Sequence, residues 1–329
     1  MRAAPALLAV VALSAPSRAV VAGLVLEGDR AELELPGGFS RVDVSSGDGE
    51  ACSLIVTGPR DALAHLQVHG ARATDAIDED GVLPRAISFV AGVEAIWVGL
   101  EVHVPVRLQK VCAAPTTAIP TDDDRVLMIG MPTPGRRDDG YVLERPNRYQ
   151  FARPDVVFSL RRALAATRAR FRRDPLGLSD LTQWDGRRPG LDVGKLRHIS
   201  HDGGRDVDVA LPSLEEPSTM RDHCEKDYND DKTSAACKPG TGKGVDAMRL
   251  AFLGGTLVAD GVLDKMFLDR EFFPEVARAA ERLARWGWIP KKAAARLEPG
   301  AGILVHVPWH TDHVHLRFLG AKALAPFPS

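Results

Sequence analysis

The sequence predicts two folded parts: a small all-β, sandwich-like domain, followed by an α+β domain built on an antiparallel sheet. Residues 23–115 contain short alternating strands separated by glycine-rich turns, a pattern typical of antiparallel sandwiches. From residue 126 onward, apolar residues at helical spacing alternate with short strand-like runs. The alternating run 313–318 follows near the end, so helices and strands are mixed in the second part.

Composition indicates an ordinary globular protein. The 329 residues are 45% hydrophobic and 26% charged, and the formal net charge is -2. This length is enough for two domains with their own cores. The near-neutral charge and the lack of long Lys/Arg runs give no indication of nucleic acid or a membrane surface as a partner.

The first residues have the pattern of a secretory signal peptide. The start is basic, an apolar run covers residues 3–13, and small residues surround two candidate cleavage sites, after Ala19 and after Ala22. The apolar run is shorter than the ~20 residues needed to span a bilayer. We therefore assign residues 1–22 to a signal peptide and expect a secreted or periplasmic protein with no membrane span in its mature form.

The cysteines agree with export, because disulfides form outside the cytosol. Four cysteines allow three pairings, and we expect the local one, Cys52–Cys112 with Cys224–Cys237. A zinc site made of all four is the rival interpretation. It is disfavoured because the chain has no Cys-x-x-Cys pair.

The first domain, residues 23–115, offers strands but no site. Its alternating runs predict strands at 25–35, 39–44, 52–56, 86–90 and 96–106. Its histidines, His65, His69 and His103, are scattered, whereas a site requires ligands that converge. We assign no role to this domain.

Residues 116–125, rich in Pro, Thr and Asp, are predicted to form a linker to the second domain, residues 126–329. Pro154 and Asp155 favour a helix start, since proline suits the first turn and a carboxylate stabilises the positive helix end. The remaining segments are predicted as helices at 245–260 and 272–288 and strands at 140–143, 178–183, 262–268 and 303–307.

The run at 313–318 would place His313, His315 and Arg317 on one face of a strand, and two imidazoles two residues apart can point at a common ion. Upstream, His201 and Asp208 are seven residues apart and are separated by the flexible Gly203–Gly204 pair. His201, Asp208 and His315 together give three ligands.

Zinc favours this mixture of imidazole and carboxylate, and catalytic zinc sites leave a fourth position open for water. We expect one Zn²⁺ per chain, with another divalent metal not excluded.

The pattern Ser200-His201-Asp202-x-Gly204-x-Asp206-x-Asp208, with His310-x-Asp312-His313-x-His315, resembles the penicillin-insensitive murein endopeptidases. These belong to the lysostaphin and D-Ala-D-Ala metallopeptidase group, which is marked by His-x6-Asp upstream and His-x-His downstream. The narrower family adds a histidine three residues before each element, matched by His198 and His310. The resemblance covers roughly residues 125–320. It departs at Asp202, where the family usually has Gln, and in the long loop between Cys224 and Cys237.

The resemblance implies that His201, Asp208 and His315 are zinc ligands. It places His313 beside the metal, where it would accept a proton or stabilise the tetrahedral intermediate. Asp312 occupies the position of an acidic general base in related carboxypeptidases. Strand alternation would turn Asp312 away from His315 unless the strand begins at His313, so the base is left open between Asp312 and His313.

Three further residues, His198, His310 and Asp206, are expected to orient the ligands from the second shell.

The resemblance also implies a function: an exported zinc endopeptidase that hydrolyses D-Ala–meso-diaminopimelate or similar cross-links in peptidoglycan. One alternative is a D,D- or L,D-carboxypeptidase or dipeptidase on the same scaffold. Another is a non-catalytic wall-binding protein with a structural zinc, for which His313 is the obvious fourth ligand. Whether the protein acts as a homodimer is left open.

Overall fold

The structure is a computed structural model. It describes the backbone of the strands between residues 20 and 105, and the residues 106–113, 128–132, 134, 139–144, 149–183, 186–190, 198–215 and 217–320. Between residues 20 and 105, side chains are described only for Val42 and residues 51–55. The predicted linker and most of the predicted signal peptide lie outside the described residues, although Val20–Ala22 form the start of the first strand.

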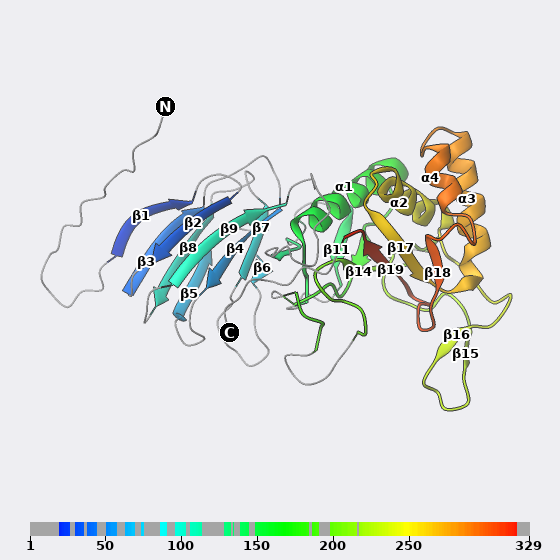
Figure 1. Cartoon of the computed structure of the whole chain (residues 1–329), viewed down its shortest axis with the longest axis horizontal. Coiled ribbons are helices and arrows are strands. Elements are labelled where there is room, and N and C mark those ends of the chain that lie inside the picture. The colour runs from blue at the N-terminus through cyan, green and yellow to red at the C-terminus, as the bar shows by residue number, and fades with distance from the viewer. Residues whose placement is uncertain are drawn as a thin grey trace, which may run out of the picture.

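Among its described residues, the first part of the chain has nine strands in two sheets, and Figure 1 shows these strands gathered at one end of the molecule. The four-stranded sheet runs β1 (Val20–Leu26), β3 (Gly38–Val44), β8 (Ile96–Val102) and β5 (Leu63–His69). The five-stranded sheet runs β2 (Arg30–Leu35), β9 (Val106–Cys112), β4 (Ala51–Thr57), β7 (Ala86–Val90) and β6 (Thr74–Asp75). The strands predicted for this part of the chain are therefore present, but an independent sandwich domain stays a prediction.

Two of the strand boundaries predicted in this part were wrong. The run 25–35 is interrupted, and its halves belong to different sheets: β1 pairs with β3, and β2 pairs with β9. The run 96–106 is likewise divided between β8 and β9, which also lie in different sheets. An alternating pattern indicates which residues share a face, but it carries no information on which strand is the neighbour.

Packing continues from these strands into the second part of the chain. Ser53 of β4 accepts a hydrogen bond from the backbone N–H of Gly130 at 2.8 Å. The side chains of Ile55 and Val111 belong to the same buried core as Met128 and Ile129. The core therefore runs without a break from β4 and β9 to β10 (Ile129–Gly130) and its partner β12 (Phe151–Ala152).

The second part is mixed α/β and is built on a six-stranded, mostly antiparallel sheet. Its order is β11 (Tyr141–Leu143), β13 (Leu176–Leu178), β14 (Asp206–Ala210), β19 (His313–Phe318), β17 (Leu263–Leu268) and β18 (Leu304–His306). The central pairs are antiparallel, and the two outermost pairs are parallel. The predicted strand 178–183 lies too far along the chain, since β13 ends at Leu178.

Helices pack along this sheet, as Figure 1 shows. They are α1 (Pro154–Phe171), α2 (Ala247–Ala259), α3 (Phe273–Arg285) and α4 (Lys291–Arg296), with the 3-10 turn η3 (Arg270–Phe272) before α3. Pro154 stands at the start of α1 with Asp155 in its first turn, as predicted, and the helix buries an apolar stripe that includes Val157, Leu160 and Leu164. Within the described residues, no helix has the length and apolar character needed to cross a membrane.

Both predicted disulfides are present. Cys52 and Cys112 are paired across β4 and β9, directly opposite one another in the register. Cys224 and Cys237 close the base of a hairpin formed by β15 (Lys226–Tyr228) and β16 (Ala235–Cys237). Two disulfides are consistent with a protein that folds outside the cytosol.

Candidate metal centre

The centre is built on the two middle strands of the sheet. In their antiparallel register, Asp208 of β14 lies opposite His315 of β19, and Asp206 lies opposite Arg317. Residues two apart on a strand share a face, so Asp206 and Asp208 lie on the same face as His313, His315 and Arg317. The register therefore gathers carboxylates and imidazoles that are more than 100 residues apart in the sequence.

His201 reaches the same face from the loop before β14. Gly203 and Gly204 both have positive φ, 67° and 71°, which glycine adopts at little cost. The Gly204 backbone also lies tightly packed: a Cβ there would come within 2.3 Å of Met128 Sδ and 2.8 Å of Arg153 N. The glycine pair thus turns the chain sharply, so that His201 lies beside the strand that follows it.

The ring of His201 is fully buried and held in one orientation. Its Nδ1–H donates to the backbone oxygen of Leu181 at 2.8 Å, and Nε2 lies 3.2 Å from Asp208 Oδ1. Burial by itself would lower the pKa of His201, but the adjacent Asp208 outweighs it and raises the pKa to about 9. The position between these two atoms therefore favours a positive charge.

Three imidazole nitrogens surround Asp208 Oδ1. His201 Nε2 lies at 3.2 Å, His313 Nε2 at 3.7 Å and His315 Nδ1 at 3.8 Å. Two donors bound tetrahedrally to zinc, each at its usual bond length, lie about 3.4 Å apart. Asp208 Oδ1 and His201 Nε2 are both buried and have no hydrogen-bond partner among the described residues. Buried polar atoms normally form hydrogen bonds, so the lack of one at these two atoms fits a role as ligand atoms for a metal ion.

His315 is oriented by the neighbouring carboxylate. Its Nε2–H donates to Asp206 Oδ1 at 2.8 Å, so the lone pair on Nδ1 faces Asp208. Asp206 is itself fixed, because the same oxygen accepts a hydrogen bond from Arg317 Nε at 2.7 Å. A carboxylate behind a histidine is the usual means by which proteins select the tautomer of a metal ligand.

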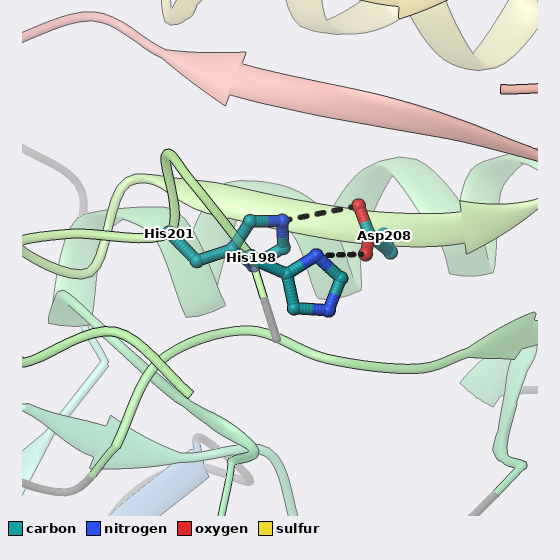
Figure 2. A group of neighbouring side chains, drawn as sticks. All are labelled: His198, His201 and Asp208. Carbon is teal, nitrogen blue, oxygen red and sulfur yellow. Dashed lines mark ion pairs between the residues drawn. The ribbon is translucent and has the colours of Figure 1, made fainter. Parts of the chain in front are cut away.

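His198 lies beside His201, with ring centroids 4.3 Å apart, and faces the second oxygen of the Asp208 carboxylate. Figure 2 shows the two imidazoles facing one oxygen each, with His198 Nδ1 3.7 Å from Asp208 Oδ2. Donor atoms of His198, His201 and Asp208 all lie within 4.8 Å of one another, so these three residues form a group that could hold a metal ion. The sequence predicted His198 only behind the ligands. Here it lies next to Asp208, so a metal ion in this group could take its third ligand from His198, whereas the sequence predicted His315.

Asp312 and His313 form a hydrogen-bonded pair. Strand β19 begins at His313, and Asp312 lies just before it with its backbone oxygen bonded to Leu211 N. His313 Nδ1–H donates to Asp312 Oδ1 at 2.6 Å, which leaves His313 Nε2 facing Asp208. Burial lowers the pKa of His313, but Asp208 and Asp312 outweigh burial and raise it. Asp312 thus contacts the ring of His313 rather than the donor atoms of the group.

His310 packs over the two histidines of β19. Its ring centroid lies 4.6 Å from that of His313 and 5.9 Å from that of His315, and its Nδ1–H donates to Pro308 O at 2.7 Å. Burial and the nearby His313 lower the pKa of His310 to about 4. It is therefore a neutral ring on the half-buried side of the group.

One residue near the group was not found by sequence reasoning. Asp180 is buried, and its Oδ2 accepts a hydrogen bond from His198 Nε2 at 2.8 Å. It lies there because Asp208 N donates to the backbone oxygen of Asp180, which extends the pairing of β13 with β14. No spacing in the sequence connects residue 180 with residue 198, so only the register of the sheet could have identified it.

Comparisons of the sequence with protein families and with curated proteins found no match. The resemblance described above therefore depends on its quoted motif residues alone.

Proposed function

We propose that this protein is an exported, zinc-dependent endopeptidase that hydrolyses the peptide cross-links of peptidoglycan. The observation that carries the proposal is the convergence of three imidazole nitrogens on Asp208 Oδ1, with His201 Nε2 and Asp208 Oδ1 both buried and unsatisfied. Buried polar atoms without hydrogen bonds are costly to maintain, and titratable groups with perturbed pKa values are concentrated at functional sites.

We assign the ligands to His201, Asp208 and His315. His201 Nε2 and His315 Nδ1 both lie near Asp208 Oδ1, at 3.2 and 3.8 Å, whereas His198 Nδ1 lies 3.7 Å from Asp208 Oδ2. His315 also has its tautomer selected by Asp206, and it lies on one of the two middle strands of the sheet. His198, which donates to Asp180, then serves as a neighbour of His201 and Asp208 rather than as a ligand.

A zinc ion held by these residues would supply Lewis acidity, which polarises a scissile carbonyl and makes water acidic enough to ionise near neutral pH. His313 is suited to proton transfer, because its Nε2 faces the group and its Nδ1–H is committed to Asp312.

In the proposed reaction, the water oxygen attacks the carbonyl carbon and its proton passes to His313 Nε2. The same proton then moves to the leaving amine as the C–N bond breaks. Asp312 stabilises the imidazolium between these steps, so His313 is the base and Asp312 its orienting partner.

The substrate class follows from the resemblance, in particular from His198 and His310. Secretion is supported by the two disulfides. A D,D- or L,D-carboxypeptidase would use the same residues on a chain terminus.

One observation favours a second candidate, a wall-binding protein with a structural metal. His313 Nε2 lies as close to Asp208 Oδ1, at 3.7 Å, as His315 Nδ1 does, at 3.8 Å. If His313 were a fourth ligand, the zinc shell would be closed, as in structural sites.

The test is digestion of purified dimeric muropeptides by the zinc-loaded protein, with and without chelator, and by the variant His315→Ala. His306→Ala is the matched control: this histidine lies on β18 of the same sheet, and its imidazole accepts a hydrogen bond from Arg270 N, away from the group. We expect the wild type and the control to convert dimers to monomers, and the chelated protein and His315→Ala to be inactive. Release of terminal D-Ala alone would identify a carboxypeptidase. If a folded, zinc-loaded protein cleaves nothing, the endopeptidase proposal is wrong and the wall-binding protein with a structural metal remains.

A further inference from the structure

A rigid hairpin projects next to the metal centre. Strands β15 and β16 pair between Lys226 and Cys237, and Figure 1 shows the hairpin extending from the body of the second part. Its turn is held by its own bonds: Asn229 N donates to Ser234 O at 3.1 Å, and Ser234 N donates to Asn229 Oδ1 at 2.7 Å. With the disulfide at its base, the hairpin has little freedom to change shape.

Trp309, the residue before His310, is fixed against this hairpin. Its backbone N–H donates to Ala235 O at 2.8 Å, and its Nε1–H donates to Thr233 O at 3.0 Å. Its φ is 65°, a left-handed conformation that is rare and costly for a bulky residue. Strain of this kind is concentrated at functional sites, and here it is retained at a residue that adds little to the core.

The ring remains exposed in spite of these contacts. Trp309 is 43% exposed and Tyr228 of the hairpin is 49% exposed, and their rings meet edge to face with centroids 6.0 Å apart. Lys226 Nζ lies 5.8 Å from the Trp309 ring centroid. We call Tyr228 and Trp309 the aromatic platform. Rigid, exposed aromatic residues that bury little of themselves are typical anchors for a ligand.

Hydrogen bonds and an ion pair connect the platform to the segment that carries His310 and His313. Thr311 O accepts from His223 N at 3.0 Å, and Thr311 Oγ1 donates to Asp222 Oδ1 at 2.6 Å. Lys226 Nζ lies 2.8 Å from the same oxygen of Asp222. A ligand on the platform is therefore held at a constant position relative to His310 and His313.

We propose that the aromatic platform binds the N-acetylated saccharide chain to which the cleaved peptides are attached. The choice of a saccharide depends on the proposed function. The Trp309 Nε1–H is already used by Thr233, so the exposed part of the indole offers apolar ring surface rather than a free donor. The two rings stand at 66° to one another, with the Lys226 ammonium beside the indole. Exposed ring surface next to an ammonium group suits a pyranose ring, which presents C–H groups and hydroxyl oxygens together. A sugar bound here would direct its peptide stem toward the metal centre.

The test measures binding of N-acetylglucosamine tetramer to the full chain by calorimetry, with and without chelator. Trp309→Gly removes the ring and relieves the left-handed backbone, so it is expected to fold. Trp286→Ala removes an exposed tryptophan at the end of α3 and serves as the control. We expect Trp309→Gly and Tyr228→Ala to weaken binding about tenfold, the loss typical of one aromatic stacking contact. Trp286→Ala and chelation should leave the affinity unchanged.

Kinetics separate this inference from the proposed function. For dimers that retain their sugars, Trp309→Gly should raise KM about tenfold and change kcat less than twofold. For the same cross-linked peptide without sugars, KM should equal that of the wild type. An equal rise in KM for both substrates would assign the platform to peptide instead. A tetramer that fails to bind, or binds Trp309→Gly as well as wild type, would overturn the inference even in an active hydrolase. If the protein binds the tetramer but is inactive, only the proposed endopeptidase function is overturned, and the binding inference stands.

Discussion

Asp206 Oδ1 accepts the Nε2–H of His315 across two neighbouring strands at 2.8 Å, and this single contact decides which nitrogen of the histidine faces Asp208. Without it, nothing in the strand pairing would distinguish Nδ1 from Nε2. Asp206 is fully buried, and Arg317 donates a hydrogen bond to the same oxygen. The first variant to test therefore changes Asp206.

Asp206→Asn should lower the affinity for zinc by about 10- to 100-fold, the range for losing an outer partner of a ligating histidine. The amide retains the shape of the carboxylate but can present an N–H donor to His315, which would disturb its tautomer. Competition with a chromophoric chelator measures the affinity. Asp264→Asn on β17 is the control, because Asp264 is half-buried and its Oδ1 lies 3.8 Å from Lys265 Nζ. Equal affinities for the two variants would contradict an orienting role for Asp206.

The identity of the third ligand is tested by His198→Ala and His315→Ala. If His315 is the ligand, its removal should weaken zinc binding by more than about 100-fold, whereas His198→Ala should cost about 10-fold, as expected for an outer residue. The same chelator competition serves both variants. The reverse order of affinities would transfer the ligand role to His198 and make the group His198, His201 and Asp208 the metal centre itself.

Zinc should stabilise the fold, because it satisfies the buried atoms His201 Nε2 and Asp208 Oδ1. At free zinc of 1,000 times Kd, linkage gives about 4 kcal/mol, which corresponds to a rise in Tm on the order of 10 °C for the second part of the chain. Differential scanning calorimetry with and without chelator measures the shift. His306→Ala should show the full shift and His315→Ala should not. A Tm independent of zinc in the wild type would argue against a site in these residues.

Sequence reasoning predicted residue types for the metal site but could not predict which of their atoms meet. The alternation of residues 313–318 and the spacing of His201 and Asp208 are local patterns, and they predicted a metal site that includes His201 and Asp208, two members of the group that could hold an ion. Which atoms meet depends on the register of β14 with β19, and this is a property of long-range pairing. For the same reason, the contacts of Asp180 with His198 and of Asp312 with His313 could not be read from the sequence. The halves of 25–35 were assigned to one strand because the alternation around Ala31–Leu35 was extended back to Val25.

Gly204→Ala should destabilise the protein much more than Gly300→Ala. Both glycines have positive φ, 71° and 86°, so both substitutions carry the backbone strain of about 1–2 kcal/mol. Only at Gly204 would the new Cβ collide with Met128 and with the backbone of Arg153, whereas Gly300 has open space. Overpacking adds about 1–3 kcal/mol at Gly204, and His201 should be displaced. Urea unfolding measures both, and equal losses would show that the close approach at Gly204 relaxes freely.

His313 has two competing roles that one pair of measurements separates. As the proton-transfer residue, His313→Ala should lower kcat by about 10²–10⁴-fold and leave zinc affinity within about tenfold of wild type. Asp312→Asn should lower kcat in the same direction, because the amide cannot stabilise an imidazolium at His313, while its effect on zinc affinity should be small. The measurements are muropeptide turnover at saturating zinc and chelator competition on the same preparations. If His313→Ala instead loses zinc as completely as His315→Ala, the closed, four-ligand site is correct, and the residue that accepts the proton must lie elsewhere in the protein.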